Sequence, residues 1–234
     1  MRSFSTPWFM LVHTRLYLHF GEPNWWPGET PFEVAVGAVL TQNTAWGNVE
    51  KAIDNLKSKD MLDPRSIHKA PDDRLAELIY PAGYRNQKAR YLKVLSEFIV
   101  SDLSGDIATL SEWETERARR TLLSLKGIGE ETADSILCYA ASKPVFVVDA
   151  YARRILSRMD PALLHDGTNG VLRRYSALRS LVMERLRGDH LLYNRFHALL
   201  VILAKEHCRS DPICENCPVR DICITGRTSF SVNE

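Results

Sequence analysis

The sequence predicts an all-α fold, and three observations lead to that prediction. Apolar residues recur at helical spacing along much of the chain, most clearly between Tyr84 and Val100. The turn Gly127-Ile128-Gly129 joins two further segments with the same spacing. The one apolar run that could form a strand, Val145 to Val148, is four residues long and has no partner strand.

The N-terminal segment, from Met1 to Phe20, is an amphipathic helix in this interpretation, and a Pro-rich loop follows it from Gly21 to Pro31. This loop contains the adjacent residues Trp25 and Trp26. Two tryptophans in such a loop either cap a core or stack on a flat ligand. The loop is therefore a candidate binding element.

A nearly all-apolar helix is predicted from Phe32 to Leu40, and a second helix from Trp46 to Leu56. The junction of these helices carries the side-chain amides of Gln42 and Asn43. Amides at this place could simply satisfy backbone groups, or they could contact a ligand.

The middle of the chain predicts two short helices, from Asp63 to Ala70 and from Asp72 to Ile79, before the long helix that starts at Tyr84. Five apolar residues at helical spacing form the predicted buried face of the long helix: Tyr91, Val94, Leu95, Phe98 and Ile99. Ser111 is predicted to begin the next helix, with Glu114 completing a capping box.

The turn Gly127-Ile128-Gly129 allows a tight bend, with Ile128 anchored in the core. Backbone N–H groups of Gly127 and Gly129 then lie at the start of a helix, where they can bind a phosphate. An ordinary helix connection is the alternative. Asp149 directly follows the apolar run Val145 to Val148, where an unpaired carboxylate would be costly to bury. The turn and the carboxylate together indicate chemistry on a nucleic acid.

The C-terminal part predicts three helices, from Tyr151 to Arg158, Asn169 to Arg187 and Leu191 to His207. Four of the chain's five cysteines follow in the pattern C-x5-C-x2-C-x5-C: Cys208, Cys214, Cys217 and Cys223. Four thiolates in one compact loop suit a [4Fe–4S] cluster. A zinc ion and free thiols are the alternatives.

Composition limits the function classes. The chain has 234 residues, 45% of them hydrophobic, and a formal net charge of +1, so it can bury a core but is not strongly basic overall. No apolar run approaches the roughly 20 residues of a membrane span. Clustered cysteines argue against a secreted disulfide scaffold. We expect a monomer in the cytoplasm, associated with the nucleoid of a prokaryotic cell.

The segment Leu125-Lys126-Gly127-Ile128-Gly129, followed by Thr132-Ala133 and Val148-Asp149, resembles the helix-hairpin-helix DNA glycosylases of the endonuclease III superfamily. Lys126 stands where family members usually have proline. The resemblance implies that Asp149 is catalytic and that Lys126, Gly127 and Gly129 contact the DNA backbone. Bifunctional members carry their Schiff-base lysine at the position of Glu131, so lyase activity is not expected.

The same resemblance implies a six-helix barrel domain at 31–143. It further implies that residues 1–30 and 144–234 form a second helical domain, which carries the [4Fe–4S] loop. It also implies that Gln42 or Asn43 fills the gap that a damaged nucleotide leaves in the duplex.

A closer resemblance is to type III 3-methyladenine DNA glycosylases. Six segments carry it: Trp25-Trp26-Pro27, Leu40-Thr41-Gln42-Asn43-Thr44, Tyr84-Arg85-Asn86-Gln87-Lys88-Ala89, Lys126-Gly127-Ile128-Gly129, Ala133-Asp134-Ser135-Ile136-Leu137-Cys138-Tyr139-Ala140 and Arg195-Phe196-His197. It implies a base pocket lined by Trp25, Trp26 and Trp46 and reached by Lys205.

We therefore expect a monofunctional enzyme that flips alkylated purines such as 3-methyladenine out of double-stranded DNA and excises them. One alternative is an endonuclease III-like or mismatch glycosylase that acts on oxidised or mismatched bases. The other is a DNA-binding module that has lost catalysis.

Overall fold

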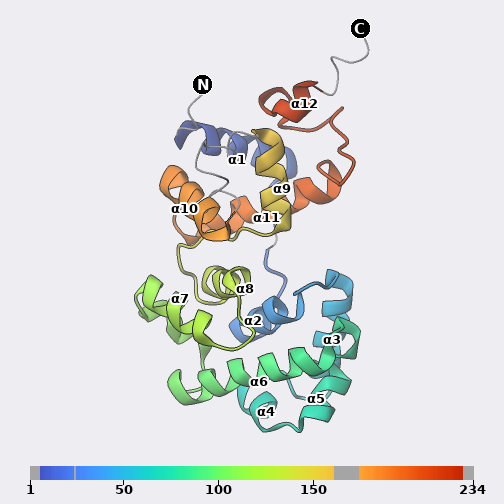
Figure 1. Ribbon diagram of the computed structural model, residues 1–234, viewed down its shortest axis with the longest axis vertical. Coiled ribbons are helices and arrows are strands. Elements are labelled where there is room, and N and C mark those ends of the chain that lie inside the picture. The colour runs from blue at the N-terminus through green and yellow to red at the C-terminus, as the bar shows by residue number, and fades with distance from the viewer. Residues whose placement is uncertain (1–5, 24, 161–173, 229–234) are drawn as a thin grey trace. The chain divides into compact units, whose positions relative to one another are not determined.

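The computed structural model describes residues 6–23, 25–160 and 174–228 and contains no strand within these ranges, which confirms the all-α prediction (Figure 1). The chain divides into two compact units. We call Trp26–Pro144 the central unit, and Met1–Trp25 together with Val145–Glu234 the terminal unit. No helix among the described residues is long and apolar enough to cross a membrane.

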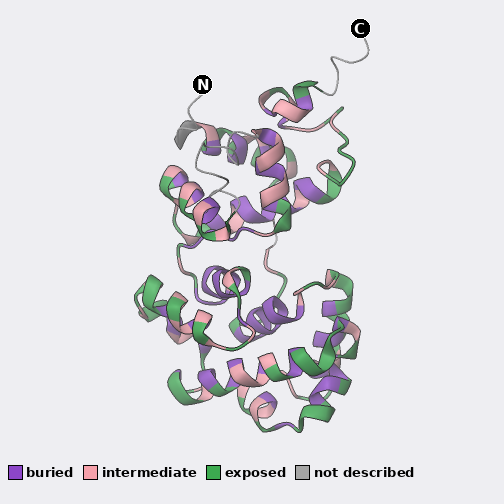
Figure 2. Ribbon diagram, viewed as in Figure 1, coloured by how far each residue is buried: buried purple, intermediate pink, exposed green. Residues whose placement is uncertain are grey.

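The central unit is built from helices α2 to α8 and three short helical turns. Its elements are α2 (Pro31–Leu40), α3 (Trp46–Lys57), α4 (Pro64–Lys69), α5 (Asp72–Leu78), η1 (Tyr80–Ala82), α6 (Arg85–Asp102), η2 (Ile107–Glu112), α7 (Thr115–Ser124), α8 (Glu130–Ser135) and the π-helical turn η3 (Ile136–Ala140). Helix α2 is buried from Phe32 to Leu40 and contacts α3, α6, α8 and η3 (Figure 2). Its nearly all-apolar sequence is therefore that of a helix at the centre of a core.

The predicted helix start at Ser111 is wrong. Residues Ile107–Glu112 form the 3₁₀ helix η2, and α7 begins at Thr115. The Glu114 carboxylate accepts hydrogen bonds from the backbone N–H groups of Glu116 (2.8 Å) and Arg117 (2.6 Å). These two bonds hold the pKa of Glu114 below its usual value. A carboxylate that satisfies two otherwise unpaired N–H groups replaces the serine cap.

The turn between α7 and α8 requires glycine at one position only. Gly127 has a φ of 92°, and a Cβ there would lie 2.1 Å from Cδ1 of Tyr91. Gly129 has an ordinary φ of −87°, and a Cβ there would meet nothing within 4 Å. Ile128 is buried in the core, as predicted.

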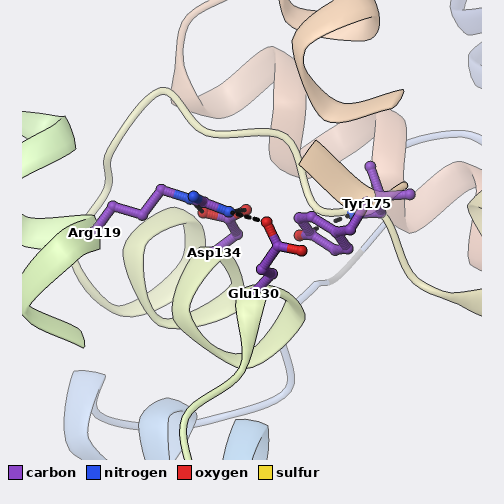
Figure 3. Close-up of polar contacts among 5 residues, drawn as sticks. Arg119, Glu130, Asp134 and Tyr175 are labelled. Carbon is purple, nitrogen blue, oxygen red and sulfur yellow. Dashed lines mark hydrogen bonds and ion pairs between the residues drawn. The ribbon is translucent and has the colours of Figure 1, made fainter. Parts of the chain in front are cut away.

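A buried ion pair fixes α7 against α8. The Arg119 guanidinium donates to the two carboxylate oxygens of Asp134 at 2.7 and 3.2 Å and to Glu130 at 3.2 Å (Figure 3). Asp134 is fully buried. Removing one member of a buried pair typically costs about 3–5 kcal/mol, because the other charge is left uncompensated. The two helices therefore meet in a defined orientation.

The terminal unit packs α1 (Thr6–Phe20) and α9 (Ala150–Met159) against α11 (His190–Glu206), and α10 (Tyr175–Leu186) against α1. Helix α12 (Ile224–Thr228) contacts α9 and η6 (Arg220–Ile222). The predicted helix from Asn169 begins at Tyr175 among the described residues, and residues 169–173 lie outside them. The segment Val145–Val148 is buried but forms no strand. The N–H of Val148 donates to the Tyr175 hydroxyl at 3.3 Å.

Candidate functional site

Asp149 ends the buried segment of the terminal unit and begins α9. Its Oδ1 accepts a hydrogen bond of 2.6 Å from the N–H of Ala152, and its Oδ2 lies 3.5 Å from Nε2 of His197 on α11. Burial raises the pKa of Asp149, but His197 and the N–H groups of Ala152 and Tyr151 outweigh burial and hold this pKa below its usual value. The side chain is 16% exposed. Asp149 is therefore a carboxylate that is ionised at neutral pH and still reachable from outside.

Trp25 and Lys205 lie beside this carboxylate–histidine pair in the terminal unit. The Trp25 ring centroid is 6.3 Å from that of His197. The Lys205 ammonium lies 5.9 Å from the Trp25 ring centroid, within the range of a cation–π contact. Lys205 itself is exposed. A continuous chain of contacts thus links Asp149, His197, Trp25 and Lys205.

Trp26 and Trp46 belong to the central unit and contact each other edge to face, with ring centroids 5.2 Å apart and an interplanar angle of 88°. Tyr139 of the π-helical turn lies 5.2 Å from Trp26 at an angle of 35°. A Cβ at Gly37 would approach Nε1 of Trp26 to 3.2 Å, so this glycine leaves room for the indole. Trp46 also lines a surface hollow, whose other lining residues are Pro27, Glu33, Gly47, Glu50, Lys51, Ile53 and Asp54.

The α2–α3 loop approaches the hairpin turn within the central unit. Nε2 of Gln42 donates to the carbonyl of Gly127 and to Oγ1 of Thr132, both at 3.0 Å. Asn43 is exposed and has a φ of 52°, which is uncommon for a residue other than glycine. The structure therefore ties Gln42 to the hairpin and presents Asn43 at the surface.

Three residues at the hairpin turn lie at the protein surface. Lys126, Gly129 and Glu131 are exposed, whereas Gly127 is half-buried. Glu131, which the sequence resemblance aligns with the Schiff-base lysine of bifunctional members, stands in the first turn of α8. A carboxylate there cannot act as an amine nucleophile.

The four clustered cysteines, Cys208, Cys214, Cys217 and Cys223, line one cavity of the terminal unit together with apolar residues of α9 and α11. Arg158 Nη1 lies 3.4 Å from Cys208 Sγ, and the N–H of Gly226 donates to Cys223 Sγ at 3.4 Å. Burial, with a smaller effect of the neighbouring cysteines, raises the pKa of Cys217 to about 11.

No three His, Cys, Asp or Glu side chains among the described residues converge closely enough to hold a single metal ion. The four cysteines are among the residues that line the cavity described above. N–H donors directed at cysteine sulfur are typical of thiolate ligands of a cluster. Four cysteine sulfurs, two of them with N–H groups directed at them, fit the donor set of a [4Fe–4S] group.

Comparison with known proteins decides the family. The model of the HhH-GPD superfamily of base excision DNA repair proteins matches residues 36–169, more than half of the chain. The chain belongs to the HhH-GPD superfamily. A Methanocaldococcus jannaschii protein named as a DNA repair glycosylase is 42% identical over 215 residues, which cover 92% of this chain and 94% of that protein.

Two solved structures are also similar to this HhH-GPD protein. The crystal structure of H. pylori 3-methyladenine DNA glycosylase bound to 1,N6-ethenoadenine is 33% identical, with a TM-score of 0.66 over 86% of this chain and 98% of that chain. An endonuclease III–DNA complex has a TM-score of 0.78 over 97% and 99% of the two chains, but at 20% identity it shows the fold alone. The chain is a DNA N-glycosylase of base excision repair.

Two residues that contact candidate site residues of this HhH-GPD protein had no predicted role. His197, at the Asp149 carboxylate, interrupts the otherwise apolar run from Phe196 to Ala204 and is 3% exposed. The sequence did contain a signal for His197, because a titratable side chain within an apolar helix is a candidate functional residue. Tyr139 carried no comparable signal, because its contact with Trp26 depends on how distant segments pack.

Proposed function

We propose that this glycosylase is monofunctional and excises alkylated purines, such as 3-methyladenine, from duplex DNA. The observation that carries the proposal is Asp149, an ionised and partly exposed carboxylate, in a chain with Glu131 at the lyase position. The 33% identity to the H. pylori 3-methyladenine DNA glycosylase supports the substrate class.

The reaction begins with extrusion of the damaged nucleotide, which costs a few kcal/mol because the base loses stacking and pairing. Stacking on an aromatic side chain returns about 1–3 kcal/mol per base. Alkylation at N3 or N7 leaves a purine positively charged, and the face of a tryptophan attracts such a cation. Trp25, Trp26 and Trp46 are the rings that we assign to this role, with Lys205 over the ring of Trp25.

Asp149 acts on the sugar. As the bond between C1′ and the base nitrogen breaks, its electron pair leaves with the base and positive charge develops on the deoxyribose ring. The Asp149 carboxylate stabilises this charge, and water adds to C1′ and loses a proton. Little general-acid help is needed because the alkylated base is already an activated leaving group. The products are the free base and an intact abasic site.

The remaining assignments concern DNA contacts and the cysteine loop. Backbone N–H groups at Gly127 and Gly129, with Lys126, hold DNA phosphates and read no sequence. Gln42 or Asn43 fills the gap in the duplex. The four loop cysteines hold a [4Fe–4S] cluster, which stabilises the C-terminal loop when bound.

A release assay tests the reaction. Wild-type protein is incubated with duplexes that carry 3-methyladenine, 1,N6-ethenoadenine, a T·G mismatch or an oxidised pyrimidine. We expect release of the alkylated purine, no strand break before alkali treatment and no adduct after borohydride reduction, because Glu131 cannot form a Schiff base. A trapped adduct would contradict the monofunctional assignment. Preferred release of thymine or of the oxidised base would favour the mismatch or endonuclease III-like alternative.

Replacing Trp46 with alanine tests the aromatic site. We expect excision of 3-methyladenine to fall by about 10- to 100-fold, as the loss of one stacking contact implies. The melting temperature should change less than for a fully buried tryptophan, whose truncation costs about 3–5 kcal/mol. Excision rate and melting temperature are measured on the same preparations.

Trp113→Ala is the matched control. Trp113 is also a half-buried tryptophan of the central unit, and it packs on Phe98 and under the guanidinium of Arg117. This control should lower the melting temperature without a selective loss of excision. Equal losses of excision in the two variants would show that Trp46 is core packing.

A further inference from the structure

Lys88 of α6 is a buried lysine, 2% exposed, whose ammonium donates hydrogen bonds to three oxygens. The acceptors are the carbonyls of Leu40 (2.7 Å) and Ala82 (2.8 Å) and Oγ1 of Thr44 (2.6 Å). An ammonium has three protons to donate, so its hydrogen-bonding capacity is fully used. None of the three acceptors is a carboxylate, so the charge is held by neutral dipoles.

Such an arrangement is costly, because burial disfavours the charged form of a lysine. The same burial lowers the pKa of Lys88 to about 8. A methionine of similar length would fill the space without this penalty. The buried charge of Lys88 is therefore best explained by the segments that its ammonium holds in place.

The three acceptors come from three segments around one loop. Leu40 ends α2, where unpaired carbonyls carry partial negative charge. Ala82 ends η1, and Thr44 lies in the loop that joins α2 to α3. Oγ1 of Thr44 also lies 2.6 Å from the carbonyl of Ala82, so the lysine, the loop and η1 form one network.

This loop carries Gln42 and Asn43. Gln42 attaches it to the hairpin through Gly127 and Thr132, and Lys88 attaches it to α6. Asn43 stands between the two attachments in a left-handed conformation. Asparagine adopts this conformation more readily than other residues except glycine, so the conformation of Asn43 is compatible with a loop attached on both sides. Lys88 supplies the attachment on the α6 side.

We propose that Lys88 is a positioning residue of the glycosylase, whose ammonium keeps the loop Thr41–Thr44 in the conformation that enters damaged DNA. The inference rests on the proposed role of Gln42 or Asn43 in filling the duplex. A loop that is already ordered loses less conformational freedom on binding, so Lys88 favours the complex with an extruded nucleotide over the complex with undamaged DNA.

The test compares Lys88→Met with Lys93→Met. Lys93 lies on the same helix and also donates to a backbone carbonyl, that of Ala70 at 2.9 Å, but its other partner is Asp72. Three quantities are measured at a temperature where both variants are folded: the single-turnover excision rate, the ratio of affinities for abasic and undamaged duplex, and the fluorescence of 2-aminopurine beside the abasic site.

We expect Lys88→Met to lose about 10- to 100-fold in excision and a similar factor in the affinity ratio, with a smaller 2-aminopurine signal. Lys93→Met should keep all three. Thr44→Val removes only the hydroxyl acceptor in the loop. It should lower the same three quantities, but by smaller factors than Lys88→Met does. This variant keeps the test decisive if Lys88→Met does not fold.

A Lys88→Met or Thr44→Val protein with wild-type excision and affinity ratio would overturn the proposal, even with a lowered melting temperature. So would equal losses in Lys88→Met and Lys93→Met. Failure of the proposed function is distinguishable: the wild-type enzyme would then release no alkylated purine, whereas the affinity ratio still reports on Lys88.

Discussion

Replacing Asp149 with asparagine is expected to abolish base release while leaving the fold and DNA binding in place. Asp149 has two functions in the structure: it caps α9 through the N–H of Ala152, and it carries a negative charge beside His197. Asparagine caps helices about as well as aspartate, so the substitution removes the charge alone. We expect the single-turnover excision rate to fall by at least about 10²- to 10³-fold, as for other groups that stabilise transition-state charge.

Asp189→Asn is the matched control for this variant. Asp189 caps α11 of the same unit through the N–H of Leu192 at 2.9 Å, and it is exposed. The chemical change is identical, so the control should keep wild-type excision. Excision is measured together with affinity for undamaged duplex and melting temperature. Full excision by Asp149→Asn would contradict the catalytic assignment.

The acid side of the pH profile should follow from the same carboxylate. The pKa of Asp149 in the folded protein lies below its usual value. The ionised carboxylate therefore contributes fully to folding stability above the unfolded-state pKa, and this contribution is lost as pH falls through the lower folded-state pKa. The excision rate per folded wild-type molecule should therefore persist at pH values below the usual pKa of a carboxyl group. A loss of activity centred above that value would indicate that another group titrates.

Local patterns predicted the helices well, because helical spacing and end signals act within a few residues. Helix α6 shows the limit. Its predicted buried face included Tyr91 and Val94, which are half-buried, whereas Lys88 and Leu92 are buried. Two overlapping sets of apolar positions fit the same spacing, and packing against α2, α4 and α5 selects between them. A pattern of apolar residues cannot predict that a lysine such as Lys88 is buried, because lysine is not counted among the apolar positions.

The sequence could nominate candidate site residues where chemistry or backbone geometry requires one residue type at one position. Asp149, the cysteines and Gly127 meet that condition: a charge after a buried segment, clustered thiols, and a φ of 92°. His197 and Tyr139 do not, because their contacts join segments that are distant in sequence. Gly129 resembles Gly127 in the motif, yet only the structure shows that its backbone is ordinary.

Iron in the cysteine loop is the remaining prediction with a large effect. We expect protein purified without oxygen to be yellow-brown and to contain about four iron atoms per chain, as four thiolate ligands around one [4Fe–4S] cluster imply. Cys217→Ser should lose most of the iron and the visible absorption. The melting temperature should fall as well, because metal binding contributes directly to the folding free energy of such loops.

Cys138→Ser is the control for the cysteine loop, since Cys138 is the one cysteine outside the loop and is buried on the π-helical turn of the central unit. A hydroxyl in that core could lower stability, but iron content and the absorption spectrum should stay at wild-type values. The four loop cysteines line a common cavity with Arg158 directed at Cys208, so loss of one ligand should affect the whole group. Stoichiometric zinc without iron in the wild-type protein, or unchanged iron in Cys217→Ser, would rule out the cluster assignment.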